Sequence, residues 1–343
     1  MAKLAGVSEA TVSLALSGSP RISDATRERV SAIADQLGYR PHAGARALRT
    51  DSTSALGLVI SDVANPFFAE LAGQIERSAA AQGYAVVLCN SDEDASRQDA
   101  YLSSLLAGSQ VDGVILVPVE EMTPGIRAAG KSQARLVLLD RPIVVHGHGA
   151  TARRLRETPV VRADATTALR EVAELLVGLG HRRFGVIALP LHIEVGRQRR
   201  DLMVAALRGC GIPDADIAVV AGDFRQHSGQ DAARALLATD PRPTAIIASD
   251  GPMAIGAMKA VRGAGLRIPD DVSLVGFDDA PWFDLLDPPL TTVAQPVNEL
   301  ASASVTAMLT LLAGKSADRN ITPACRLVTR SSCAPPPHRK EHS

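Results

Sequence analysis

The stretch VSEATVSLALSG, residues 7–18, has the length and the boundary residues of one short helix close to the start of the chain. Ser8 is a good N-cap for a helix that runs from Glu9 to about Ser17, because a serine hydroxyl can accept a free amide of the first turn. Gly18 suits the C-terminal end of that helix. The stretch therefore predicts a compact helix with defined ends.

Two further helices are expected on either side of it. Residues 2–5 predict the end of a helix that is turned by Gly6. Ser23 is expected to cap a longer helix that Gly38 closes, and the apolar residues between them keep helical spacing. Two short helices joined by a Gly-containing turn, with a third behind them, predict a helix-turn-helix unit. A small helical bundle that serves as a dimerisation cap is the alternative.

The charge of the chain is unevenly distributed. Residues 1–50 contain seven Lys or Arg and four Asp or Glu, a net charge of +3, although the whole chain carries −1. The remainder therefore carries about −4. This asymmetry indicates a small module that faces a polyanion, joined to a larger acidic body.

Composition restricts the class of protein. A chain of 343 residues with 46% hydrophobic and 21% charged residues is globular and long enough for two or three domains. No apolar run approaches the roughly 18 residues that span a bilayer, and residues 1–10 lack the apolar core of a secretory signal. The four cysteines lack metal-ligand spacing. Reduced thiols and a cytoplasmic location are therefore expected.

Beyond residue 53, short apolar runs recur in two sets of four. They are residues 56–60, 85–89, 113–117 and 136–140, then 184–188, 217–220, 245–248 and 273–277. Runs of four or five residues that are apolar on both faces predict buried parallel strands. Helix-like stretches such as 68–82 and 165–179 lie between them. We expect two doubly wound α/β lobes with a ligand cleft between them, and a disordered tail over 334–343.

Four separated motifs carry a resemblance to a known family. AKLAGVSEATVSLALSG, YRPHAGARALR, IPDDVSLVGFDD and PPLTTVAQP together resemble the LacI/GalR family of transcriptional regulators, over Met1 to about Arg330. The resemblance implies a helix-turn-helix head, a hinge helix and a body similar to periplasmic sugar-binding proteins. The body is expected to dimerise, and an effector in its cleft is expected to alter operator affinity, as in a repressor.

Domain boundaries follow from the same resemblance. The head is expected over 1–40, the hinge over 41–52 and the body over 53–333. Within the body, the N-lobe is expected to hold 53–157 with 281–312, and the C-lobe 158–280 with 313–333. The tail lacks the pattern of a heptad helix, so it offers no added association element for a tetramer.

The resemblance places DNA-binding residues along the helix that opens this section. They are Ser8, Glu9, Ala10, Thr11, Ser13 and Leu14. Val12 is expected to pack inward. Leu14 departs from the family, because a hydrogen-bonding residue is usual there; it can contact only a thymine methyl, whereas Glu9 could accept from cytosine N4. As an alternative, the Ser and Thr hydroxyls merely cap and solvate the helix.

The stretch PHAGARALR, residues 41–49, matches the hinge of the family. Leu48 corresponds to the leucine that wedges between base pairs in the minor groove, and Arg46 and Arg49 are expected near phosphates. Gly44 lowers helix propensity by roughly 1 kcal/mol relative to alanine. Taken alone, the stretch is an ordinary basic linker.

The first helix has barely one turn, which is too short to be stable without packing. Members of the family carry several residues before the position equivalent to Met1. We therefore expect the natural start of the protein to lie upstream.

The resemblance also supplies candidate effector-binding residues. They are Phe67, Phe68, Arg199 and Asp250, with Asp140, Arg141 and Trp282 of lower rank. Phe68 resembles the aromatic that stacks on the ligand, although one of the two phenylalanines is expected in the core. Arg197 and Arg200 leave the register of the clamping arginine open.

Two alternatives concern the acidic residues. Gly251 could hold the acidic position instead of Asp250, which could simply cap a helix, and Asp278 and Asp279 could be structural. A stacking aromatic with Asp and Arg partners suits a sugar. A nucleobase or a phosphorylated metabolite remains open.

Signals for an enzyme are weak. GHGATA, residues 147–152, fits a dinucleotide fingerprint, but Pro159 stops the short charged stretch that follows. His146 and His148 have no third ligand at metal spacing. Neither G-x-S-x-G nor H-E-x-x-H occurs. We expect no enzyme activity, no cofactor and no metal. The alternative function is a small-molecule-binding module with a defective DNA-binding head.

Overall fold

A computed structural model describes residues 1–16, 19–38, 52–107 and 110–337 of the protein. The chain divides into two compact units, a head that spans 1–54 and a body that spans 55–343. The two units are described separately below. No helix among the described residues is long and apolar enough to cross a membrane.

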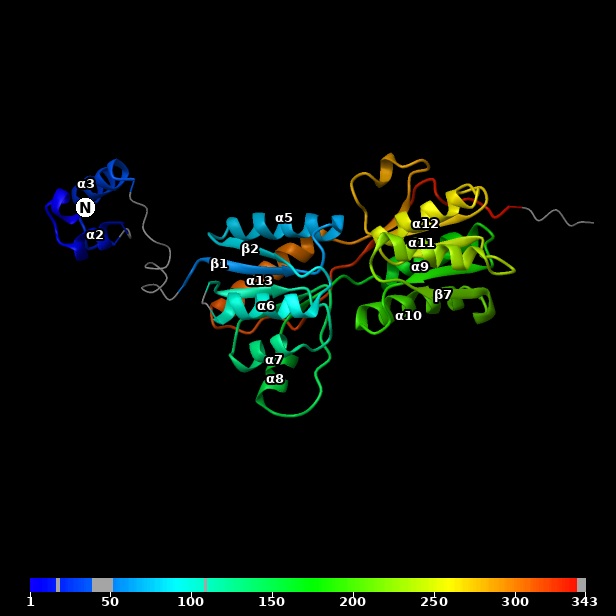
Figure 1. Ribbon diagram of the computed structural model, residues 1–343, viewed down its shortest axis with the longest axis horizontal. Helices are drawn as coiled ribbons and strands as arrows, with labels where there is room; N and C mark the ends of the chain where they lie inside the picture. The colour runs from blue at the N-terminus through cyan, green and yellow to red at the C-terminus, as the bar shows by residue number, and fades with distance from the viewer. Residues whose placement is uncertain (17–18, 39–51, 108–109, 338–343) are drawn as a thin grey trace, which may run out of the picture. The chain divides into compact units, whose positions relative to one another are not determined.

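The described head contains three helices (Figure 1), namely α1 (Ala2–Ala5), α2 (Glu9–Leu16) and α3 (Asp24–Gln36). Ala5, Val12, Ala15 and Val30 form their small core. Alanine at two of these four positions lets the helices approach closely. The predicted order and approximate bounds of the three helices are confirmed, with α2 described as far as Leu16.

The predicted helix ends are confirmed at three of four positions that the structure describes. Ser8 Oγ accepts a hydrogen bond from the amide of Thr11 at 3.1 Å. Gly6 and Gly38 have φ of 64° and 59°, the left-handed conformation expected just after α1 and α3.

The prediction for Ser23 is confirmed for its position at the N-cap of α3 but not for its side chain. The Ser23 side chain caps no helix amide, because its hydroxyl pairs with that of Thr26 at 3.0 Å. The Ser23 carbonyl, and not the side chain, accepts the first helical amides. Ser17 and Gly18 lie outside the described residues.

The N-lobe of the body is built on a six-stranded sheet in which every pairing is parallel. Its strands, in the order β11-β5-β4-β3-β1-β2, are Asn320–Ile321, Val160–Val161, Leu136–Leu139, Gly113–Leu116, Ala55–Ile60 and Ala85–Asn90. Helices α5 (Pro66–Ala80) and α13 (Val297–Leu312) pack on one face. Helices α6 (Ala95–Ala107), α7 (Pro124–Lys131) and α8 (Ala150–Glu157) cover the other face (Figure 1).

The C-lobe repeats this plan. Its strands, in the order β12-β10-β9-β8-β6-β7, are Arg326–Val328, Thr291–Ala294, Ser273–Phe277, Ala245–Ala248, Phe184–Ala188 and Ile217–Ala221. Only β12 is antiparallel to its neighbour. Helices α9 (Thr166–Gly178) and α10 (Glu194–Gly209) cover one face, and α11 (Gln226–Leu237) and α12 (Gly251–Gly263) cover the other. Two short 3₁₀ turns are η1 (Asp214–Asp216) and η2 (Phe283–Leu285).

All eight predicted strands form, and the predicted pair of doubly wound lobes is confirmed. Two of the eight strands are not buried as predicted. Leu88 on β2 is 46% exposed and Val219 on β7 is 37% exposed. Both strands lie at an edge of their sheet, and only part of their surface packs against a helix. Strands β5, β10, β11 and β12 were not predicted, because each has only two to four residues.

The predicted lobe boundaries are wrong in three places. Strand β5 belongs to the N-lobe, although the C-lobe was expected from residue 158. Strand β10 pairs with β9 in the C-lobe, although 281–312 was assigned to the N-lobe. Strand β11 pairs with β5 in the N-lobe, although 313–333 was assigned to the C-lobe. The chain crosses between the lobes three times, and short crossing strands leave no period in the sequence.

The segment that was predicted as a tail is anchored at its beginning. The Ala334 amide donates to Ser273 Oγ at 3.0 Å, and the Ala334 carbonyl lies 2.9 Å from His181 Nε2. Buried His181 also contacts Thr244 Oγ1 through Nδ1 at 2.9 Å. The prediction of disorder from residue 334 is therefore wrong for Ala334. Residues 338–343 lie outside the described part of the chain.

Candidate functional site

The carboxyl ends of the parallel strands in both lobes present polar residues to a cleft between the lobes. Strand β1 leads to Ser61 and Asp62, and β4 leads to Asp140. In the C-lobe, β8 leads to Asp250 and β9 leads to Asp278. This is the position at which open α/β sheets bind ligands.

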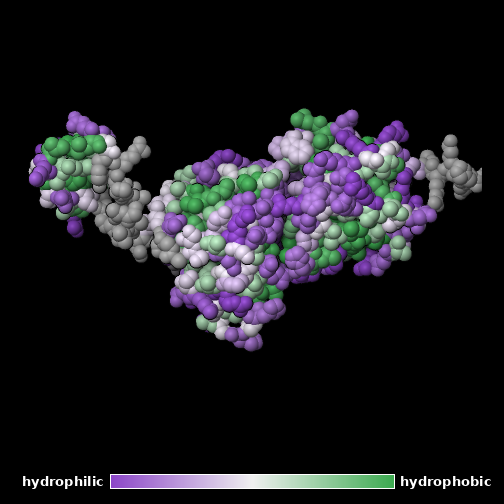
Figure 2. Space-filling view, viewed as in Figure 1, coloured by the Kyte–Doolittle hydropathy of each residue, from purple (hydrophilic) through white to green (hydrophobic). Residues whose placement is uncertain are grey.

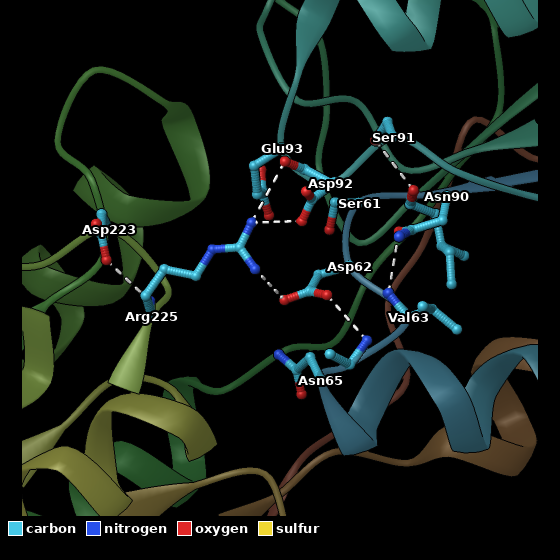
Figure 3. A network of polar contacts seen from close by, with 12 residues as sticks. Ser61, Asp62, Val63, Asn65, Asn90, Ser91, Asp92, Glu93, Asp223 and Arg225 are labelled. Carbon is cyan, nitrogen blue, oxygen red and sulfur yellow. Dashed lines mark hydrogen bonds and ion pairs between the residues drawn. The ribbon is translucent and has the colours of Figure 1, made fainter. Parts of the chain in front are cut away.

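Polar side chains connect the two lobes directly (Figure 3). Arg225 of the C-lobe donates to Asp62 Oδ2 at 2.8 Å and to Asp92 Oδ1 at 2.7 Å, both in the N-lobe. The hydrogen bond from Arg225 lowers the pKa of Asp92. Arg197 of the C-lobe pairs with Glu121 of the N-lobe. These contacts hold the cleft closed in this structure.

Arg141 is the most buried cation of the cleft. It donates two hydrogen bonds to Glu93, at 2.8 and 2.7 Å. Its guanidinium carbon lies 4.3 Å from the ring centroid of Phe224 in the other lobe and 6.0 Å from that of Phe68. Burial opposes its charge, but the Glu93 carboxylate outweighs burial, and the pKa of Arg141 is raised. Arg141 is therefore a fixed cation between two aromatic rings.

Arg199 lies among the strand ends of the C-lobe, whereas Arg197 of the same motif bridges the two lobes. Its guanidinium stacks 3.7 Å above the ring of Phe277 and donates to the Ser249 carbonyl at 2.7 Å. Arg197 instead pairs with Glu121, and Arg200 pairs with its neighbour Asp201. The geometry favours Arg199 among the three positions that the sequence left open.

Asp250 combines the two roles that the sequence left open. It is the N-cap of α12, since Oδ1 accepts from the Met253 amide at 2.9 Å. Its other oxygen lies 3.4 Å from Asn65 Nδ2 of the opposite lobe. Gly251 is the first residue of α12 and carries no side chain, so Asp250 is the acidic group at this position.

Asp278 is a second buried acid beside Asp250. It accepts from Gln295 Nε2 at 2.7 Å and from the Gly251 amide at 3.4 Å. Burial raises the pKa of both carboxyls, and the charge of Asp278 raises that of Asp250 further. Such acceptors favour ligand groups that donate hydrogen bonds, because a donor relieves the repulsion between the two acids.

The aromatic candidates have different environments. Phe67 and Phe68 are both buried in the N-lobe core and pack edge to face with ring centroids 5.0 Å apart. Phe67 lines a cavity of about 180 Å³ together with Asn65, Asp278 and Trp282. Trp282 is 40% exposed.

The remaining acidic candidates differ in role. Asp140 is buried, with Oδ2 3.6 Å from Arg141 Nε. Asp279 has partners of its own: it pairs with Arg330 at 2.7 Å and accepts a hydrogen bond from Thr292. Asp279 is thus structural, as one of the two sequence interpretations has it.

Backbone strain is concentrated at the cleft. Seven described non-glycine residues have positive φ. Five of them precede or line the cleft, with φ between 55° and 70°: Asp92, Glu93, Asp140, Phe224 and Asp278. Non-glycine residues adopt this conformation at a cost, and such residues gather at binding sites. The strain is an observation independent of the side-chain contacts.

Several cleft residues were not predicted. They are Ser61, Asn65, Glu93, Phe224, Arg225 and Gln295. Asn65 could have been recognised, since Asn-Pro before a helix is an N-cap signal, and its side chain does accept from the Phe67 amide. The others lie in loops after strand ends, where the sequence has no period.

Helix α2 presents most of the predicted DNA-binding residues outward. Glu9, Ala10 and Ser13 are exposed, whereas Thr11 and Leu14 are half-buried. Val12 is 8% exposed and lies in the core, as predicted. Exposed Ser8 caps the helix, so its capping role is structural whatever else it contacts. Gly44, Arg46, Leu48 and Arg49 lie outside the described residues.

The weak enzyme signals have ordinary structural surroundings. Helix α8, which follows the GHGATA stretch, has only eight residues, and its Arg156 donates to the Gly147 carbonyl. His146 and His148 are exposed. Over the described ranges, no three His, Cys, Asp or Glu residues are placed to hold a metal ion.

A three-helix head and a two-lobed body with a polar inter-lobe cleft define the class of ligand-responsive DNA-binding regulators. Residues 1–42 match the family model of bacterial regulatory proteins, lacI family, and residues 173–333 match that of the periplasmic binding protein-like domain. The Escherichia coli K12 ribose operon repressor is 31% identical over 90% of this chain and 91% of its own. The protein belongs to the LacI family.

Two solved structures extend this similarity. The lac repressor dimer bound to operator and the anti-inducer ONPF has a TM-score of 0.83 against this chain. The two sequences are 28% identical over 97% of both chains. A LacI family regulator from Enterococcus faecium with bound ribose has a TM-score of 0.71 and 25% identity, over 82% of this chain and 99% of its own.

Proposed function

We propose that this protein is a transcriptional repressor of the cytoplasm that binds operator DNA as a homodimer and responds to a neutral monosaccharide in the cleft. It is a regulator and not an enzyme. The proposed ligand class rests on two buried acids of the C-lobe, Asp250 and Asp278. Their carboxyls interact with the charge of Arg199 from the same lobe, and that of Asp250 also with Arg141 from the N-lobe. Sugar hydroxyls can donate to carboxylates and accept from guanidinium groups at the same time.

The charges of the cleft favour a neutral ligand over a phosphorylated one. Seven carboxylates line or border the cleft: Asp62, Asp92, Glu93, Glu121, Asp140, Asp250 and Asp278. Three of the four guanidinium groups there, those of Arg141, Arg197 and Arg225, already pair with carboxylates. An anion would therefore meet more repulsion than attraction.

The size of the ligand is suggested by the relatives. One relative is named a ribose operon repressor, and one similar regulator structure contains ribose. A pentose is the first ligand to test, and rings of this kind also offer an apolar face to Phe68 or Phe224. Titration calorimetry with D-ribose, D-ribose 5-phosphate and adenosine would separate the three ligand classes; binding of the phosphate ester alone would contradict the proposal.

Exposed apolar residues supply a face for the homodimer. In the N-lobe, Val63, Val87 and Leu88 are 44, 38 and 46% exposed, and in the C-lobe Leu285 is 82% exposed. In Figure 1, α5 with β2 and the loop that carries η2 lie along the same side of the body. Figure 2 shows hydrophobic residues over both regions. Exposed apolar residues gathered on one side of a protein mark interaction sites.

The DNA-binding part of the proposal is tested by fluorescence anisotropy. A 20-base-pair duplex selected by this chain from a random-sequence pool is titrated at two salt concentrations, with and without D-ribose. Tight, salt-sensitive and sequence-selective binding that changes with ribose is expected. Selection that enriches no sequence would support the alternative, a ligand-binding module with a defective head.

A further inference from the structure

One corner of the N-lobe is strongly basic although the body as a whole is acidic. Each basic residue of this corner lies in one of two places. It is either at the amino-terminal edge of the sheet or in the last two turns of a helix that leads to that edge. These residues are Arg127, Lys131, Arg135, Arg153, Arg154, Arg156, Lys315 and Arg319, here called the basic edge. Purple, hydrophilic residues gather over the α7–α8 corner in Figure 2.

Sheet topology brings the basic edge together. Strands β11, β5 and β4 are neighbours and run parallel, so the residues that precede them lie along one line. Arg319 directly precedes β11, Arg135 directly precedes β4, and Arg156 lies in the last turn of α8 before β5. Arg319 donates to the Arg156 carbonyl, and Arg154 donates to that of Gly130 at 2.7 Å. Neighbouring strands are about 4.8 Å apart, so these charges are closely spaced.

The charge of the basic edge is not neutralised within the protein. None of its eight residues makes an ion pair with a described carboxylate, although Arg residues elsewhere in the body make many. Three acids, Asp112, Glu157 and Asp318, lie at the same edge, which leaves a net charge of about +5. Since residues after position 50 carry about −4, the rest of the body carries about −9.

Helix capping explains only part of this cluster. Lys131, Arg154 and Arg156 lie in the last turns of α7 and α8, where a cation stabilises the helix dipole. Arg135 precedes a strand and lies outside the helix ends, whereas Arg319 donates to the carbonyl of Arg156 in the last turn of α8. Their side chains carry unpaired charge beside that of the helix ends, which costs repulsion unless a polyanion is bound.

The path of the chain indicates which polyanion this is. Strand β1 is parallel to β3 and therefore begins, at Ala55, at the same edge of the sheet as Arg135. The polypeptide thus enters the body from the DNA-binding head at the basic edge. On the proposed function, the basic edge is therefore the part of the body that lies at the point where the chain arrives from the DNA-binding head.

We propose that the basic edge binds phosphates of the duplex that flanks the operator. This contact is independent of sequence and adds to the contacts of the head, and it rests on the proposed DNA-binding function. Its signature is salt dependence, because each phosphate that is neutralised changes the slope of log K against log salt by about 0.9. Base discrimination would be unchanged, since phosphate contacts carry no sequence information.

The test compares two charge-matched variants of the full chain. The edge variant carries Lys131→Gln, Arg135→Gln and Arg153→Gln, whose side chains make no internal hydrogen bond among those of the described residues. The control variant carries Lys259→Gln, Arg182→Gln and Arg242→Gln, which remove the same charge from the C-lobe. Each is titrated with the selected 20-base-pair duplex alone and with the same duplex extended by 15 base pairs on each side.

A change in the salt dependence of binding is expected only for the edge variant on the extended duplex. On the extended duplex, the salt slope of the edge variant is less steep than that of the wild type by about 2 to 3, and that of the control variant is not. On the short duplex all three proteins have the same slope. Equal slopes for both variants on the extended duplex would overturn the inference while the proposed function stands. Failure of the wild type to bind the selected duplex would instead overturn the proposed function, and this inference with it.

Discussion

Arg225 in the C-lobe lies 2.8 Å from Asp62 in the N-lobe, and this ion pair joins the lobes (Figure 3). The Arg225 side chain is 32% exposed and that of Asp62 is 10% exposed. Asp223 accepts from the Arg225 amide at 2.9 Å, which fixes the backbone that carries the guanidinium. The closed cleft is therefore stabilised by the protein itself as well as by any ligand.

Removal of this ion pair should weaken ligand binding. In Arg225→Gln, closure loses a partly exposed charge-assisted contact of about 1 kcal/mol, so the affinity for D-ribose should fall roughly fivefold. The ligand-free variant should also have a larger radius of gyration by small-angle X-ray scattering, because the open form gains population.

A matched control lies on α11, the helix that begins directly after Arg225. Arg234 pairs with Asp231 inside α11 and touches no residue of the N-lobe among the described contacts. Arg234→Gln removes the same charge and should change neither affinity nor radius. Equal effects of the two substitutions would refute a role of Arg225 in closure.

Asp250→Asn should increase stability and decrease ligand affinity. Because burial raises the pKa of Asp250 in the folded state, the folded protein binds more protons than the unfolded chain above the ordinary Asp pKa. The stability contributed by this group therefore falls as pH rises through that range, and is lowest at neutral pH. Asparagine keeps the N-cap of α12 without the charge. The melting temperature at pH 7.5 should rise, whereas D-ribose affinity should fall at least tenfold. A lower melting temperature would contradict the assigned ionisation.

His181 should make stability fall in mild acid. Burial lowers the pKa of His181, so the unfolded chain takes up a proton at a higher pH than the folded protein. Its contribution is fully present above the ordinary histidine pKa and is lost as pH decreases below it. The melting temperature should therefore drop between pH 7.5 and 5.0 by less in His181→Gln than in the wild type. His148→Gln, at an exposed position, is the control and should leave the drop unchanged.

The sequence predicts the long buried strands better than the short crossing ones. Residues 56–60 and 273–277 are recognisable because sheets covered on both faces need continuous apolar runs. Strand β11 has two residues and is defined only by its pairing with β5. Segment assignment between the lobes therefore depends on tertiary contacts that leave no periodic signal.

The cleft could be predicted only where a local rule or a family motif applies. Asp250 and Arg199 lie in recognisable motifs, and the structure brings both to the cleft. Phe224 and Glu93 adopt positive φ in loops, which neither composition nor spacing indicates. Arg225 meets a carboxylate 163 positions away in the sequence, a pairing that only the closed arrangement of the lobes creates.

One substitution in the proposed dimer face should convert the dimer into a monomer. Leu88→Asp places a charge on the exposed edge strand β2, and burying it in an interface costs several kcal/mol. Sedimentation velocity at micromolar concentration should show a monomer. Val219→Asp modifies the exposed edge strand of the other lobe and should remain dimeric. A dimeric Leu88→Asp protein would exclude this edge as the interface.

Recognition by α2 should be limited mainly by the residues at positions 9 and 14. Glu9 is exposed and Leu14 half-buried on this helix, and neither can make the bidentate contact that an arginine makes with guanine. Leu14→Ala should lower affinity for the selected duplex by up to tenfold and relax the preference for thymine at one position. Glu9→Gln should instead alter the preference at a position read as cytosine. Selection from a random pool, repeated for each variant, measures both effects. Identical enriched sequences for the wild type and both variants would show that these side chains do not read bases.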